Sequence, residues 1–135
     1  MSLRDKRMLT THIDRCLTEE ELSNPSQELG EEVKALTQSF QERADRVCNH
    51  FMVNPIPIEV NIMPSKIYGE YFADKIIIYT TTKVGGIIMS YPMEEVYDTL
   101  IHELAHYIAD DITHKEDFKE MYDLIKNFLN NFNPL

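Results

Sequence analysis

The chain has 135 residues, of which 43% are hydrophobic and 10% aromatic, a composition typical of a single soluble globular domain. Its formal net charge of -10 argues against nucleic-acid binding by this chain alone, because such binding needs clustered Lys and Arg to contact phosphates. No apolar run approaches the length of a membrane span. Cys16 and Cys48 are isolated, which favours a reducing, cytoplasmic setting over a disulfide framework.

The first elements expected along the chain are helices. Apolar residues between Met8 and Leu17 predict a short helix that ends before Asn24-Pro25. Residues 28–51 have the clearest helical pattern, with a charged opposite face, and we expect a scaffold helix that lies on a sheet. Its apolar positions are Leu29, Val33, Leu36, Phe40, Ala44, Val47 and Phe51. We expect residues 1–135 to form one domain in which residues 1–25 pack loosely.

Strands are expected in the middle of the chain. Residues 56–62 alternate between apolar and other side chains, which predicts a half-buried strand. A short second strand is expected around Gly69, within residues 66–72. The β-branched run within residues 75–82 predicts a third strand. Gly85-Gly86 indicates a turn.

Two further helices are expected after the strands. The apolar spacing of residues 93–108 predicts a helix capped by Ser90, with Pro92 in its first turn. The spacing from His114 to Asn130 predicts the last one. Helices before and after a contiguous set of strands favour an α+β fold.

The run His102-Glu103-Leu104-Ala105-His106 has the H-E-x-x-H pattern of a helical zinc site. Residues four apart lie on one face of a helix, so both imidazoles can reach one metal ion. Glu103 projects beside that ion and can accept a proton from the water that the metal activates. The motif lies on the polar stripe of a mostly apolar helix, which favours a metal site over two surface histidines.

Two histidines leave zinc short of ligands, because a catalytic site usually has three protein ligands and a water. His114 is the best candidate for the third ligand. Thr113 and Glu116 form a T-x-x-E capping box, which places His114 in the first turn of the next helix, where the neutral imidazole is favoured. Weaker candidates are the carboxylates Asp110, Asp111 and Asp117.

His114 follows the pentapeptide after an interval of seven residues, and Phe118 lies four residues further on. This arrangement resembles that of the SprT-like metallopeptidases and the compact minigluzincin proteases. The resemblance covers Thr99 to Met121. In these families a strand-rich segment with a Gly precedes the metal helix, and Gly69 to Thr81 fits that place. The resemblance implies a zincin-like fold: N-terminal scaffold helices, a small mixed β-sheet, the metal helix and a C-terminal helix. Many SprT-like proteins have Gly after the third His, where this chain has Lys115.

The motif and the resemblance predict a zinc-dependent peptidase that acts on a peptide or protein substrate. One Zn²⁺ would be held by His102, His106 and His114, with Glu103 as general base. In zincins an extended substrate lies along an edge strand above the metal. By resemblance residues 75–82 are the candidate, although an interior position for them is equally open. Residue type alone makes Tyr107 or Tyr68 a candidate to stabilise the oxyanion.

Three other functions stay open at this point. The first is a zincin-fold interaction module with weak or latent hydrolysis, against which the intact Glu103 counts. The second is a structural zinc protein, with the site closed by Asp110, Asp111 or Glu116. The third is a phage-type metallopeptidase, in which a carboxylate replaces His114 as third ligand.

Overall fold

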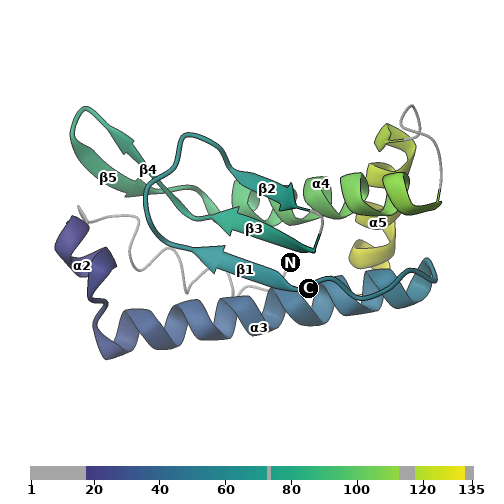
Figure 1. The fold of residues 1–135 in the computed structure, drawn as a ribbon, viewed down its shortest axis with the longest axis horizontal. Helices are drawn as coiled ribbons and strands as arrows, with labels where there is room; N and C mark the ends of the chain where they lie inside the picture. Colours follow the sequence, from purple (N-terminus) through teal and green to yellow (C-terminus); the bar gives the residue numbers. More distant parts are fainter. Residues whose placement is uncertain (1–17, 73, 113–117, 133–135) are drawn as a thin grey trace.

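The structure is a computed structural model that describes residues 18–72, 74–112 and 118–132. The described chain begins with helices α2 (Glu19–Ser23) and α3 (Gln27–His50), continues through short strands, and ends with helices α4 (Met93–Ile112) and α5 (Phe118–Phe132) (Figure 1). The strands are β1 (Ile58–Asn61), β2 (Gly69–Phe72), β3 (Lys75–Tyr79), β4 (Thr81–Val84) and β5 (Ile87–Ser90). This order confirms the predicted α+β class. The predicted helix between Met8 and Leu17 and the predicted capping box at 113–116 lie outside the described residues.

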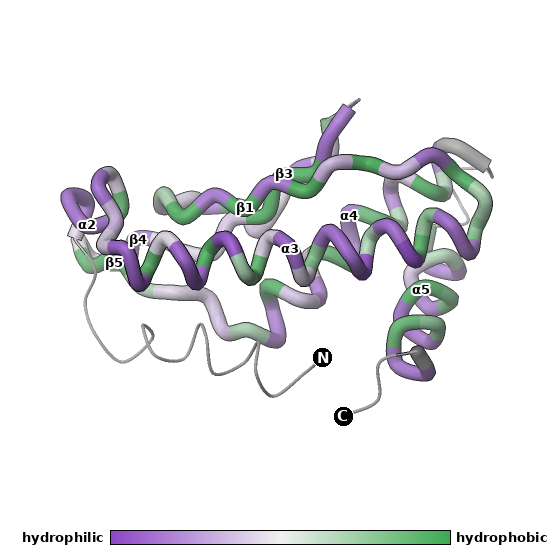
Figure 2. Tube along the Cα trace, turned by 90° about the horizontal axis from the view of Figure 1, so that it is seen from below, coloured by the Kyte–Doolittle hydropathy of each residue, from purple (hydrophilic) through white to green (hydrophobic). Residues whose placement is uncertain are grey.

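Helix α3 is the long amphipathic helix that the sequence predicts. It begins where the side chain of Ser26 accepts a hydrogen bond from the backbone N–H of Leu29 at 3.1 Å. Its apolar residues are buried, and Figure 2 shows hydrophobic and hydrophilic residues alternating along it. It ends at His50, two residues before the left-handed Met52 (φ 58°), and the N–H of Val53 donates to the carbonyl of Cys48 at 2.9 Å. The side chain of Cys48 is buried.

The three-stranded sheet has the order β1-β3-β2. Strand β3 pairs in parallel with β1 and antiparallel with β2, so β3 is interior and β2 lies at an edge. Of the two positions left open for residues 75–82, the structure shows the interior one for β3 and not the edge position. The strand ends at Tyr79, and Thr81 and Thr82 belong to β4. Ile76, Ile77 and Ile78 are all buried, so both faces of this interior strand are covered.

Strands β4 and β5 form a separate antiparallel hairpin that the sequence analysis missed as a pair. Gly85 and Gly86 form its turn with φ values of 56° and 82°, which suit glycine and match the right-handed twist of a hairpin. Ser90 pairs with Thr81 in this hairpin and is not the cap of the next helix. Helix α4 begins at Met93, and the carbonyl of Pro92 accepts the first helical hydrogen bonds.

One hydrophobic core joins the three-stranded sheet to α3, α4 and α5. Alternate sheet residues Ile58, Ile76 and Ile78 point into this core. Helix α5 lies against α4, so the helix that carries the H-E-x-x-H motif is held between the sheet and α5 (Figure 1). In the described part of the chain, no helix is long and apolar enough to cross a membrane.

Candidate metal and catalytic site

Helix α4 presents His102 and His106 on its exposed face, while the residues beside them, Ile101, Leu104 and Ala105, are buried in the core. The Nε2 atoms of the two histidines lie 3.1 Å apart, and their rings meet edge to face at 4.7 Å between centroids. The predicted i, i+4 pair therefore forms on the polar stripe of a firmly packed helix.

This pair fits two ligands of one zinc ion. Zinc binds imidazole nitrogen at about 2.0–2.1 Å with tetrahedral angles, which places two such nitrogens about 3.3 Å apart. The observed 3.1 Å is close to that value. The pKa of His106 is lowered, chiefly by burial and then by His102, while Asp110 opposes the shift. A lowered pKa keeps the imidazole neutral, which is the form that binds metal.

Phe118, the first residue of α5, lies against both imidazoles. Its ring stacks on His106 at 4.3 Å with an interplanar angle of 28°, and it meets His102 at 4.9 Å and 69°. These contacts restrict how the two histidine rings can turn. Outer contacts of this kind orient metal ligands in known sites.

Glu103 is 7% exposed, and its side chain lines a cleft. Burial raises the pKa of Glu103, the charge of His102 lowers it, and the charge of Glu70 raises it. A largely buried carboxylate at a cleft loses part of its hydration, which disfavours its ionised form and suits a group that exchanges a proton.

The cleft has a volume of about 360 Å³ and lies between α4 and strand β2 with the loop before it. The loop and strand supply Lys66, Ile67, Tyr68 and Gly69, and the helix supplies Asp98, Thr99, His102 and Glu103. The edge strand β2, not β3, therefore lies above the candidate catalytic residues. Asp98 and Lys66 were not foreseen as site residues, because no sequence pattern shows which loop packs over the helix.

Tyr107 and Tyr68 are the two candidates for stabilising the oxyanion. The hydroxyl of Tyr107 donates to the backbone carbonyl of Asn54 at 2.7 Å, and the residue is 9% exposed. Tyr68 lines the cleft together with His102 and Glu103. Of the two candidates, only Tyr68 has its side chain at the cleft.

The third metal ligand is not found among the described residues. In residues 18–72, 74–112 and 118–132, no group of three or more His, Cys, Asp or Glu side chains could hold a metal ion. Asp110 is exposed one turn beyond His106 but does not complete such a group. His114, Glu116, Asp117 and the side chain of Asp111 lie outside the described part, so their assignment stays a prediction.

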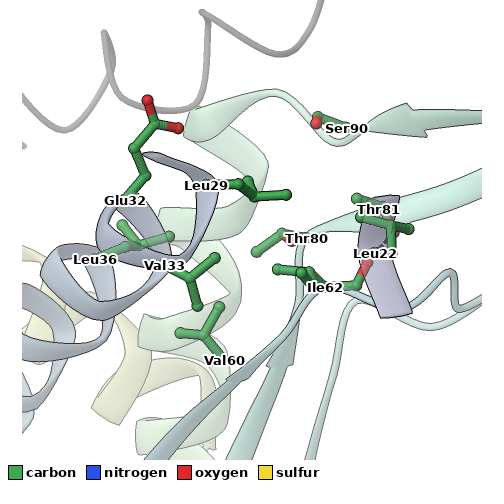
Figure 3. Close-up of a pocket in the computed structure, with 10 residues that line it drawn as sticks. All are labelled: Leu22, Leu29, Glu32, Val33, Leu36, Val60, Ile62, Thr80, Thr81 and Ser90. Atoms are coloured by element: carbon green, nitrogen blue, oxygen red, sulfur yellow. Dashed lines mark hydrogen bonds between the residues drawn. The ribbon is translucent and has the colours of Figure 1, made fainter. Parts of the chain in front are cut away.

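A second, small cavity lies away from this site, where α2 and the start of α3 meet the strands (Figure 3). Its volume of about 20 Å³ is enough for roughly one water molecule. Leu29, Val33, Ile62 and Thr80 point toward one another around it (Figure 3). It is a gap in apolar packing and offers no group that suits catalysis.

Comparisons of the chain with protein-family models, with curated proteins and with solved structures found no match. The function is therefore argued from the residues and geometry of this site.

Proposed function

We propose that this chain is a zinc-dependent peptidase of the zincin type, similar to the SprT-like enzymes. One observation carries the proposal. Two imidazole nitrogens lie 3.1 Å apart on one helix face, beside a nearly buried carboxylate that faces a cleft below a strand edge. A helix that needed only packing would have no use for this combination.

The chemistry assigns each residue a separate task. Zinc held by His102 and His106 would act as a Lewis acid that lowers the pKa of a water molecule and polarises a carbonyl group. Glu103 accepts the proton of the attacking water and returns it to the leaving nitrogen. The raised pKa of Glu103 suits this task, because a group that accepts and returns a proton works best with a pKa near the working pH. Tyr68, which lines the cleft, would donate a hydrogen bond to the developing oxyanion.

Strand β2 is the proposed guide for the substrate backbone. One side of β2 pairs with β3, and no strand of the described chain pairs with its other side. An extended peptide can therefore add to this edge, as peptides do at other exposed sheet edges. Such a peptide would run past the cleft that contains Glu103.

We propose His114 as the third ligand. Phe118 touches both imidazoles, and His114 precedes it by four residues. Four residues of extended chain span at most about 14 Å, so the position of Phe118 is compatible with a ligand from His114. A carboxylate from the same loop is the alternative.

The test is a matched pair of proteins, the parent and Glu103→Gln. After exhaustive dialysis both should contain about one zinc per chain, because Glu103 is not a ligand and the substitution is isosteric. The parent should cleave an unstructured protein such as casein, and the variant should be slower by about 10²–10⁴-fold. A parent without zinc after loading ends the proposal. If the parent binds zinc but cleaves no substrate, the zincin-fold interaction module becomes the favoured function.

A further inference from the structure

Residues 65–68 form the loop that walls the cleft opposite α4, and we call them the cleft loop. Three of its four residues line the cleft, and the last of these is Tyr68. Backbone hydrogen bonds fix both ends of the loop. At the first end, the N–H of Ser65 donates to the carbonyl of Thr81 at 3.0 Å. At the other end, the carbonyl of Tyr68 accepts from the N–H of Tyr79 at 2.9 Å.

Tyr91 adds a side-chain hydrogen bond at the first end of the cleft loop. Its hydroxyl donates to the carbonyl of Ser65 at 2.7 Å, and its own N–H donates to the carbonyl of Thr80 at 2.8 Å. The residue is 8% exposed and belongs to the main hydrophobic core. It precedes the first residue of α4 by two positions. The hydroxyl of Tyr91 therefore joins the cleft loop to the start of the helix that forms the opposite wall.

The ring of Tyr91 also contacts the side chain that the loop presents to the cleft. The rings of Tyr91 and Tyr68 lie 4.5 Å apart between centroids, at an interplanar angle of 39°. Tyr68 is 45% exposed, so contact with a buried ring restricts a side chain that would otherwise keep much of its rotamer freedom. The charge of Glu95 is the main cause of a raised pKa of Tyr68, which keeps the phenol protonated and able to donate.

We propose that Tyr91 is a positioning residue, which holds the cleft loop so that the hydroxyl of Tyr68 lies where the oxyanion develops. This inference rests on the proposed peptidase function and adds a residue to it. Tyr91 is buried and does not line the cleft, so it acts through Tyr68 and does not touch the substrate. An oxyanion donor must lie about 3 Å from the developing charge, and small displacements of such a group cost much of the rate.

The alternative role for Tyr91 is packing alone, because a buried hydroxyl needs a partner in any case. The chain offers a matched residue for that role. Tyr107 is 9% exposed, and its hydroxyl donates to the backbone carbonyl of Asn54, also at 2.7 Å. Asn54 lies in the connection between α3 and β1 and does not line the cleft. Tyr107→Phe therefore removes the same kind of hydrogen bond without releasing the cleft loop.

The first measurement needs no activity and uses NMR on the metal-free parent, Tyr91→Phe and Tyr107→Phe. Phenylalanine keeps the ring of Tyr91 and removes only its hydroxyl. In Tyr91→Phe, the amide of Ser65 should exchange its hydrogen about five-fold faster relative to the amide of Ile76, whose hydrogen bond lies outside the cleft loop. The ring signals of Tyr68 should shift in the same variant. Tyr107→Phe should leave both readouts unchanged.

The second measurement is a double-mutant cycle for the cleavage of casein by the zinc-loaded parent, Tyr91→Phe, Tyr68→Phe and the variant with both changes. Tyr68→Phe should lower kcat by about 10²-fold or more, as the loss of an oxyanion donor does. Tyr91→Phe should lower kcat by about five-fold, the effect of one hydrogen bond, and leave KM nearly unchanged. When Tyr68 is already phenylalanine, Tyr91→Phe should change kcat by less than about two-fold, because no donor is left to position.

The outcomes separate this proposal from the peptidase function. Faster exchange at Ser65, with a loss of kcat that vanishes in the Tyr68→Phe background, supports the positioning role of Tyr91. A loss that adds to that of Tyr68→Phe, as the loss in Tyr107→Phe should, overturns the role and leaves the peptidase standing. Unchanged signals of Ser65 and Tyr68 in Tyr91→Phe overturn it whatever the activity. If the parent cleaves nothing, the peptidase proposal ends, and the NMR measurement alone decides whether Tyr91 holds the cleft loop.

Discussion

Gly69 lies so close to Thr99 that a β-carbon added to Gly69 would meet Cγ2 of Thr99 at 2.6 Å. The same carbon would lie 3.1 Å from the carbonyl oxygen of Ile77 and 3.4 Å from Cγ of Glu103. The absence of a side chain therefore sets how near the edge strand β2 lies to α4. This spacing forms one wall of the cleft that Glu103 faces.

We predict that Gly69→Ala destabilises the protein by about 1–3 kcal/mol, because the added methyl group overpacks the contact between β2 and α4. Urea unfolding of the parent and the variant measures the difference. Adding Thr99→Ser to Gly69→Ala removes Cγ2 but keeps the hydroxyl that donates to the carbonyl of Glu95, so part of the loss should return.

The matched control for this prediction is Gly30→Ala. A β-carbon at Gly30 meets nothing within 4 Å, and the residue lies inside α3. Alanine there should stabilise the protein by about 0.5–1 kcal/mol. Equal effects at Gly30 and Gly69 would contradict the close approach of β2 to α4.

The helices were predictable because long apolar patterns are local. Residues 28–51 and 93–108 show the helical period over several turns, and α3 and α4 follow those limits within a few residues. The pair His102 and His106 could be predicted for the same reason, since its spacing is fixed by one helix.

The sheet order and the cleft could not be predicted in the same way. The run Ile76-Ile77-Ile78 reads alike in an interior and an edge strand, and only pairing with β1 and β2 decides its place. The chain leaves one sheet for the other at Thr80, whose carbonyl accepts from the N–H of Tyr91 at 2.8 Å. Lys66 and Asp98 lie at one cleft through contacts that join distant parts of the sequence, and no short pattern records such contacts.

Zinc affinity should identify the third ligand. We predict that His114→Ala weakens zinc binding by more than the roughly 10–100-fold that loss of an outer partner typically causes. Asp110→Ala should change the affinity little, because Asp110 does not complete a metal group in the described structure. Competition with a chromophoric chelator measures the zinc affinity of the parent and of both variants. If His114→Ala binds zinc as tightly as the parent, a carboxylate is the third ligand. The phage-type metallopeptidase is then favoured over the SprT-like one.

The contact between Tyr122 and Asp98 should stabilise the protein at neutral pH and lose this effect at high pH. The folded pKa of Tyr122 is raised to about 12 from its ordinary value of 10.0, so its contribution is complete below pH 10.0 and is lost as pH rises toward 12. We predict that Tyr122→Phe costs about 0.5–1.5 kcal/mol at pH 8, the value typical of one hydrogen bond. Urea unfolding at pH 8 and pH 11 measures the free energy of unfolding of both proteins. The difference between them should be smaller at pH 11. No difference at pH 8 would mean that the ring of Tyr122, which phenylalanine keeps, and not its hydroxyl stabilises the protein. A difference that stays constant up to pH 11 would contradict the raised pKa of Tyr122.

Glu103→Gln should make the metal-free protein more stable while it removes activity. Burial raises the folded pKa of Glu103 above its ordinary value of 4.5, so the folded state disfavours the ionised form. The cost of this ionisation is complete above the folded pKa and vanishes below the unfolded pKa. Glutamine has the same shape and no charge, so the variant should gain stability at pH 7.5 but not at pH 4.

Thermal unfolding of the metal-free parent and variant at both pH values measures this gain. A matched substitution at an exposed carboxylate, Glu42→Gln on α3, should change the melting temperature little at either pH. A gain at pH 7.5 that disappears at pH 4 would mean that the fold bears the free-energy cost of holding a base in the cleft, as active sites often do. A variant less stable than the parent at pH 7.5 would instead mean that the carboxylate of Glu103 stabilises the fold, and its assignment as the general base would lose that support.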